Sequence, residues 1–195
     1  NAAEHEQAIA EAVAAYPDAK WRVVTIHQDI YGSGLDHSDT DGMILRTQLT
    51  PIFDEYDIDV VLQGHDHTYS RSKLLYSDGL THDIYSMPFD EEANDYDWDH
   101  AMNAATGELY TLWPEEGNAE QEASKQAFVD GNLCYTIEDV SGTTVVNPQG
   151  TLYMTANSAS GSKFYELLST QQDYIAARSQ NWLPSYSVIS MDSDS

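Results

Sequence analysis

The hydrophobic and polar positions in the first third of the chain predict two helices and two short strands. Residues 3–16 and 43–56 carry apolar side chains at intervals of three and four positions, which is typical of amphipathic helices. Residues 21–27 and 58–64 are short runs rich in valine and isoleucine, which predict buried strands. The order strand, helix, strand over residues 21–64 predicts a parallel βαβ unit.

The pattern changes in the middle of the chain. Residues 77–132 are acidic, rich in Asn and Gly, and show little periodicity, so we expect a long surface insertion in a single domain of residues 1–195. Beyond it we expect strands at 134–140, 143–146 and 150–157, a short helix at 173–182 and a final strand at 185–192. This mixture of helices and strands predicts an α/β (α+β) fold.

Charge narrows the partners that the chain can have. Thirty-three acidic residues against eight basic ones give a net charge of −25. Such a chain repels nucleic acid backbones and anionic membrane surfaces, so we expect no nucleic acid partner. No segment approaches the ~20 apolar residues that a membrane-spanning helix needs, so we expect no membrane span.

Cysteine content limits the chemistry further. Cys134 is the single cysteine, which excludes a disulfide within the chain and a thiolate zinc cluster. We expect Cys134 to be a buried, small apolar side chain. Any metal site would therefore use His, Asp, Glu or Asn. A bound metal would also give an acidic chain the local positive charge that an anionic substrate requires.

Three histidines follow the two predicted strands. His27 closes the first strand, and His65 and His67 come directly after the second, in the stretch VVLQGHDHTYSR. The carboxyl ends of parallel strands lie at one edge of a sheet, and alternate residues of an extended segment point the same way. We therefore expect the three side chains to converge on one centre. Imidazole is a common metal ligand, so the pattern predicts shared metal binding.

Three stretches of the chain resemble a known family. WRVVTIHQDIYGSG, DEYDIDVVLQGHDHTYSR and GTLYMTANSASGSKFY are similar to the C-terminal half of the calcineurin-like metallophosphoesterases, and within them to bacterial relatives of purple acid phosphatases. The resemblance implies the C-terminal half of a two-sheet β-sandwich flanked by helices. It also implies a metal-dependent phosphoester hydrolase that acts on monoesters with two metal ions. The family motifs Asp-x-His, Gly-Asp-x-x-Asp and Gly-Asn-His are absent here, so we expect them to precede Asn1.

The resemblance also implies roles for the metal ligands. His27 and His65 would bind one metal ion, and His67 would bind the other. The two ions would be divalent or trivalent, and imidazole and carboxylate ligands suit iron, zinc and manganese alike.

Further residues would act on the substrate, a small-molecule phosphate ester. His37 lies in the loop where similar enzymes carry a histidine that protonates the leaving group. The alternative is a surface histidine bonded to a neighbouring aspartate. Tyr69 and Arg71 would shape the mouth of the site, where Arg71 could meet the phosphate. Packing of Tyr69 on the sheet and pairing of Arg71 with an acid remain open.

Two other functions remain open at this stage. One is a mononuclear site in which the three histidines leave one coordination position open. The other is a noncatalytic acidic interaction module that retains the fold. As the back half of an enzyme, the isolated chain would be inactive, and a homodimer would cover its exposed sheet. The family resemblance favours a secreted or cell-surface location.

Overall fold

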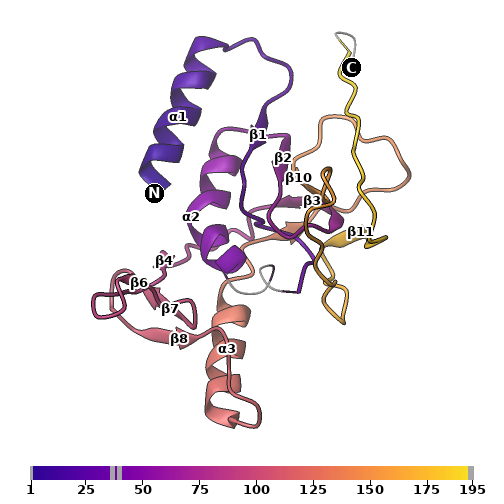
Figure 1. The fold of residues 1–195 in the computed structure, drawn as a ribbon. Coiled ribbons are helices and arrows are strands. Elements are labelled where there is room, and N and C mark those ends of the chain that lie inside the picture. The colour runs from indigo at the N-terminus through magenta and orange to yellow at the C-terminus, as the bar shows by residue number, and fades with distance from the viewer. Residues whose placement is uncertain (1, 36–37, 39–40, 193–195) are drawn as a thin grey trace.

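A computed structural model describes residues 2–35, 38 and 41–192 of the chain. These residues form a mixed α/β fold around one main sheet, with two helices beside it and a smaller unit set to one side (Figure 1). The helices are α1 (Ala2–Ala15), α2 (Asp41–Glu55) and α3 (Ala119–Gly131). The strands of the main sheet are β1 (Val23–Thr25), β2 (Val60–Gln63), β3 (Tyr69–Tyr76), β9 (Thr136–Ile137), β10 (Thr151–Ala156) and β11 (Ile175–Ser179).

The main sheet begins with the predicted βαβ unit. Strands β1 and β2 are parallel, with Val23 opposite Val60, and α2 connects them, so the prediction is confirmed. The sheet runs β1-β2-β10-β3-β11, and β9 pairs with the end of β3. Strand β10 is parallel to β2, whereas β3 is antiparallel to both β10 and β11. The carboxyl ends of β1 and β2 therefore lie side by side at one edge of the sheet.

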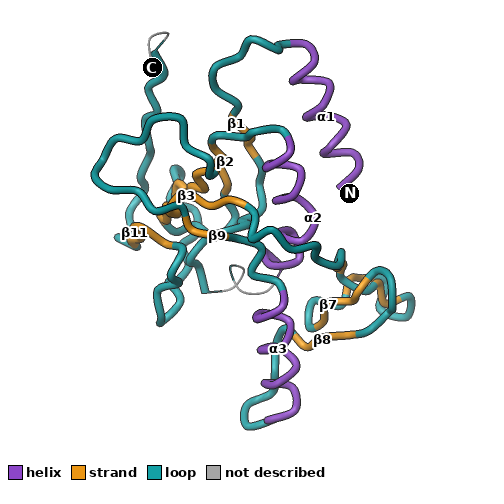
Figure 2. The backbone as a smooth tube through the Cα atoms, turned by 180° about the vertical axis from the view of Figure 1, so that it is seen from behind, coloured by secondary structure: helices purple, strands orange, loops and turns teal. Residues whose placement is uncertain are grey.

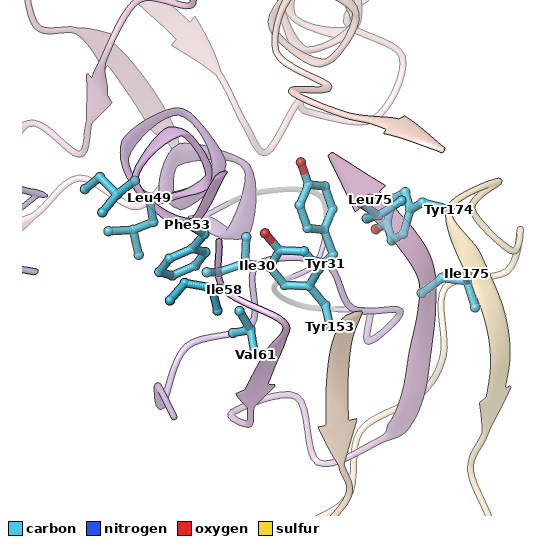
Figure 3. Close-up of a cluster of buried hydrophobic side chains, with 11 residues drawn as sticks. Ile30, Tyr31, Leu49, Phe53, Ile58, Val61, Leu75, Tyr153, Tyr174 and Ile175 are labelled. Carbon is cyan, nitrogen blue, oxygen red and sulfur yellow. The ribbon is translucent and has the colours of Figure 1, made fainter. Parts of the chain in front are cut away.

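The main hydrophobic core lies between α2 and the sheet (Figure 3). Phe53 of α2 is 1% exposed and packs toward Val61 and Tyr153 on the strands. Other buried members come from the loop after β1 and from the segment that enters β11: Ile30, Tyr31, Leu49, Ile58, Leu75, Tyr174 and Ile175. Truncating a buried aromatic side chain costs roughly 3–5 kcal/mol, so this core holds α2 and the loop after β1 on the sheet.

Arg46 of α2 fixes the loop after β1. Its side chain is 2% exposed and lies 4.4 Å from the centre of the Tyr31 ring. The guanidinium donates to the Ile30 carbonyl at 2.8 Å and to the Tyr174 hydroxyl at 3.1 Å. That hydroxyl in turn donates to the Gly32 carbonyl at 2.9 Å. A buried cation normally requires such partners, and here they join the loop to a segment far along the chain.

The acidic insertion has more regular structure than its sequence pattern predicts. It contains β4 (Tyr85–Ser86), β5 (Phe89–Asp90), β6 (Asp95–Tyr96), β7 (His100–Asn103) and β8 (Leu109–Thr111). Strands β4, β7 and β8 form one small sheet, and α3 lies next to β8 (Figure 2). A second core forms around Phe128 and Tyr85. Strands of two to four residues are too short to show periodicity in the sequence, which is why the pattern did not reveal them.

Three further predictions failed near the C-terminus. The helix expected at 173–182 is instead strand β11. Two alanines give this stretch a local preference for helix, but pairing with β3 overrides it. In the described part of the chain, the segments 143–146 and 185–192 pair with no strand. Their alternating pattern fits a strand, yet a strand is stable only where an open sheet edge lies within reach.

Candidate metal centre

His27 and His65 lie next to each other at the carboxyl ends of β1 and β2. His27 Nε2 is 3.0 Å from His65 Nδ1, and the ring centroids are 5.0 Å apart. The backbone holds the two residues in place, because the Gly64 amide donates to the His27 carbonyl at 3.1 Å. A Cβ at Gly64 would come within 3.3 Å of that carbonyl, so a residue without a side chain suits this contact.

The distance between these two nitrogens is compatible with two chemical situations. In a metal-free pair, one nitrogen carries a proton and donates to the other. In a metal site, two ligands that each lie ~2.1 Å from one ion are themselves ~3.0–3.4 Å apart. Both rings are partly accessible to solvent. The separation of the two nitrogens by itself fits either situation.

His67 lies apart from this pair. Its Nδ1 is 2.9 Å from the Lys163 carbonyl, which can only accept, so Nδ1 carries the proton and Nε2 keeps its lone pair. Its ring also lies 5.3 Å from the ring of Tyr165. The segment is not extended as the sequence argument assumed, because His65 and His67 have φ angles of 69° and 48°. Left-handed turns at both positions break the alternation.

The three histidines do not form one compact ligand set. In residues 2–35, 38 and 41–192, no three His, Cys, Asp or Glu side chains gather closely enough to hold a metal ion. A mononuclear site made of all three histidines therefore does not fit this arrangement. His27 and His65 fit two ligands of one ion, and any further ligands would have to come from elsewhere.

Asp66, between the two histidines, is a buried anchor for the loop after β1. It is 0% exposed, and its Oδ2 accepts hydrogen bonds from the Gly34 amide at 3.0 Å and the Ser38 hydroxyl at 2.7 Å. A Cβ at Gly34 would lie 2.4 Å from the same oxygen, so glycine is required for this close approach. The turn that carries His65 and His67 is thereby tied to the described residues on either side of 36–37.

Asp29 forms a second buried carboxyl group beside Asp66. It accepts hydrogen bonds from the Thr155 hydroxyl at 3.0 Å and from the side-chain amide of Gln63. Burial raises its pKa well above the usual range, and the neighbouring Asp66 raises it further. Asp66 Oδ1 is buried and has no hydrogen-bond partner among the described residues. The raised pKa of Asp29 favours its protonated, neutral form beside Asp66.

Sequence reasoning did not identify this carboxyl pair. The stretch that follows Asp29 has glycines at 32 and 34. Gly32 lies against the Asp29 carboxyl group, and Gly34 lies against the Asp66 carboxyl group. A Cβ at Gly32 would lie 2.0 Å from Asp29 Oδ2. Closely spaced glycines after a strand were thus the available signal that buried side chains press against the backbone.

The remaining predicted residues lie elsewhere or outside the described residues. His37 is one of the residues that the structure does not describe, so its role as proton donor stays a prediction. Arg71 lines a groove of about 680 Å³ with Lys73 and Glu138. Tyr69 lines a separate hollow of about 210 Å³ that contains none of the three histidines, and the Arg71 groove contains none of them either. The predicted role of Tyr69 and Arg71 at the mouth of the site stays a prediction.

Comparison with known proteins adds little detail. No model of a known protein family matches the chain. A stretch of 55 residues, 28% of the chain, is 38% identical to two Mycobacterium tuberculosis proteins, from strains CDC 1551 / Oshkosh and ATCC 25618 / H37Rv. Each is described only as an uncharacterized protein, and the aligned stretch covers 10% of its length. Among the described residues, no helix combines the length and apolar character needed to cross a bilayer.

Proposed function

We propose that this chain is the histidine-bearing part of a metal-dependent phosphoester hydrolase that acts on phosphomonoesters. The observation that carries the proposal is the approach of His27 Nε2 to His65 Nδ1 at 3.0 Å, at the carboxyl ends of two parallel strands. Open α/β sheets bind their ligands at this edge. The left-handed backbone at His65 adds support, because unfavourable φ angles concentrate at functional sites.

The separation of His67 supports a site with two metal ions. His27 and His65 would hold one ion, and His67 would contribute to the other through Nε2, since its Nδ1 donates to the Lys163 carbonyl. The hydrogen bond to the Lys163 carbonyl would set the tautomer and the ring orientation, as in many metal sites. When bound, iron, zinc or manganese would lower the pKa of a water and polarise the phosphoryl group.

The other residues of the chain would position the histidines and move protons. Asp66 would hold the turn that carries His65 and His67 against the loop after β1, through its hydrogen bonds to Gly34 and Ser38. His37, in that loop, would protonate the departing alkoxide, for which a group with a pKa near neutrality is suited. The remaining metal ligands, including an anionic bridge, would come from segments with the family motifs that this sequence lacks.

The proposal can be tested by metal titration of the chain. We expect Zn²⁺ or Mn²⁺ to bind in isothermal titration calorimetry, and His27→Ala and His65→Ala each to weaken binding by more than tenfold. His100→Ala is the matched control, because His100 lies in the insertion and bonds to Asp97 at 2.8 Å. Equal affinities in the wild type and in both site variants would refute the assignment of ligands.

The catalytic part of the proposal needs a separate assay. A full-length protein that contains this chain should hydrolyse an aryl phosphate in the presence of metal, and His65→Ala should abolish that turnover. Full activity of the His65→Ala variant would show that the histidine pair is not part of a catalytic centre.

A further inference from the structure

A groove of about 290 Å³ lies between α2 and the acidic insertion. Asp41 and Leu45 line it from α2, and Met87, Tyr96 and Trp98 line it from the insertion. The surface of the groove is mostly apolar. Its volume is close to the lower limit of small-molecule sites, which begin at ~300 Å³. The groove can therefore hold a compact organic group.

One wall of the groove is joined through the backbone to the candidate metal centre. Gln28, which directly follows His27, forms part of its wall. The Gln28 side-chain amide donates to Asp41 Oδ2 at 3.3 Å, which links the end of β1 to the first turn of α2. Adjacent Cα atoms are ~3.8 Å apart, so the backbone of this wall lies beside that of His27.

Aromatic side chains in and beside the groove are open to solvent. Tyr96 is 53% exposed and Trp98 is 50% exposed. Phe89, which is 52% exposed, packs edge-on against Tyr96 with ring centroids 5.4 Å apart. The rings of Phe89 and Tyr96, on strands β5 and β6, belong to neither hydrophobic core. Clustered, exposed aromatic residues of this kind are typical of surfaces that bind a ligand.

Charge complementarity identifies the kind of ligand. Asp41 is the charged residue that lines the groove. The surrounding insertion, residues 77–132, contains 14 acidic residues and one basic residue. This field repels an anionic group and attracts a cationic one. The faces of Trp and Tyr rings also attract cations, and quaternary ammonium ions gain most from such contacts because they are weakly hydrated.

We propose that this groove binds an organic ammonium group, held against Trp98 and Tyr96 within the negative field of the insertion. If the chain is part of a phosphomonoesterase, which is the function proposed above, its substrates are phosphate esters of amino alcohols. The phosphate would lie toward His27 and His65, and the ammonium group would lie in the groove. The acidic insertion would then select the substrate.

The test uses choline and its neutral isostere, 3,3-dimethylbutan-1-ol, which differ by one charge at nearly constant shape. The indole N–H signals of the 195-residue chain are followed by NMR while each compound is added. We expect choline to shift the Trp98 signal, and the isostere to bind roughly tenfold more weakly. Raising the salt concentration should weaken choline binding, because exposed charges are screened.

A pair of tryptophan variants locates the site. Trp98→Leu keeps an apolar contact but removes the ring face, so choline affinity should fall about tenfold. Trp113→Leu is the control, because Trp113 is also in the insertion and is 44% exposed but lies outside the groove. Equal binding of choline and the isostere, or unchanged choline affinity in Trp98→Leu, would overturn the proposal.

The outcome can be separated from that of the proposed hydrolase function. The choline titration contains neither metal nor phosphate ester. Failure of the hydrolase proposal would appear as unchanged metal affinity in the His27 and His65 variants. Failure of the ammonium site would appear in the choline titration, as equal binding of choline and the isostere or as unchanged choline affinity in Trp98→Leu.

Discussion

Replacing Gly34 with alanine should destabilise the loop that covers the buried carboxyl pair. A Cβ at Gly34 would lie 2.4 Å from Asp66 Oδ2 and 2.5 Å from Asp66 Cγ, well inside contact distance. Neither side can yield easily, because Asp66 is 0% exposed and accepts the Gly34 amide at 3.0 Å. The carboxylate would have to move away from the loop that it holds.

The size of the effect follows from two costs. Overpacking a well-filled interior costs roughly 1–3 kcal/mol. Loss of a hydrogen bond to a charged group costs about 1.5–3 kcal/mol. If both occur, the free energy of unfolding falls by about 2.5–6 kcal/mol. A domain of this size has only ~5–15 kcal/mol in total, so the variant would be close to unfolding at moderate temperature.

Urea denaturation followed by far-ultraviolet circular dichroism measures this change. Gly131→Ala is the control, because a Cβ there meets nothing within 4 Å and the expected change is within ~0.5 kcal/mol. In an Asp66→Gly background, Gly34→Ala should cost much less, since the overlapping group is gone. The reasoning is refuted if Gly34→Ala and Gly131→Ala change the free energy of unfolding by the same amount.

Three other predictions follow from the charges and the site. The isolated chain with added metal should hydrolyse no aryl phosphate, because three neutral histidines provide no anionic bridge between two cations; turnover that disappears in His65→Ala would show that the chain is catalytically complete. Burial raises the pKa of Asp54 to about 6, so wild-type stability should fall as the pH rises from ~4 through 6. Urea denaturation at several pH values should show that Asp54→Asn gains stability relative to wild type over that window. A difference between the two proteins that stays constant with pH would contradict the assignment. In the full-length enzyme, His37→Ala should slow substrates with poor leaving groups far more than those with good ones, because only a basic alkoxide needs a proton; equal losses in kcat would exclude a general acid role.

The sequence predicted the elements that show a clear apolar pattern over their own length. The stripe of α2 and the β-branched run of β2 are strong periodic signals, and both elements formed where expected. Strand β11 was missed because its alanines favour a helix until β3 provides hydrogen-bond partners. Such pairing depends on residues about a hundred positions away, which no local pattern can contain.

The candidate site was predictable in part for a similar reason. The proximity of His27 and His65 followed from strand topology, since both close parallel neighbours. The position of His67 depended on two left-handed residues, and the alternation argument did not anticipate them. The burial of Asp66 was also hidden, because a charged residue in a turn normally faces solvent.

The hydrogen bonds around Arg46 and Tyr174 determine when the loop after β1 can be fixed during synthesis of the chain. The loop after β1 is held by Tyr174, whose hydroxyl bonds to Gly32, and by Arg178, which donates to the Ser33 hydroxyl at 3.1 Å. These partners are translated more than a hundred residues after the loop that they hold. A ribosome-bound chain that ends before residue 174 would contain His27 and His65 but could not lock the loop beside them. Fixing of this loop would therefore be a late folding event, which needs residues 174–178 to have emerged.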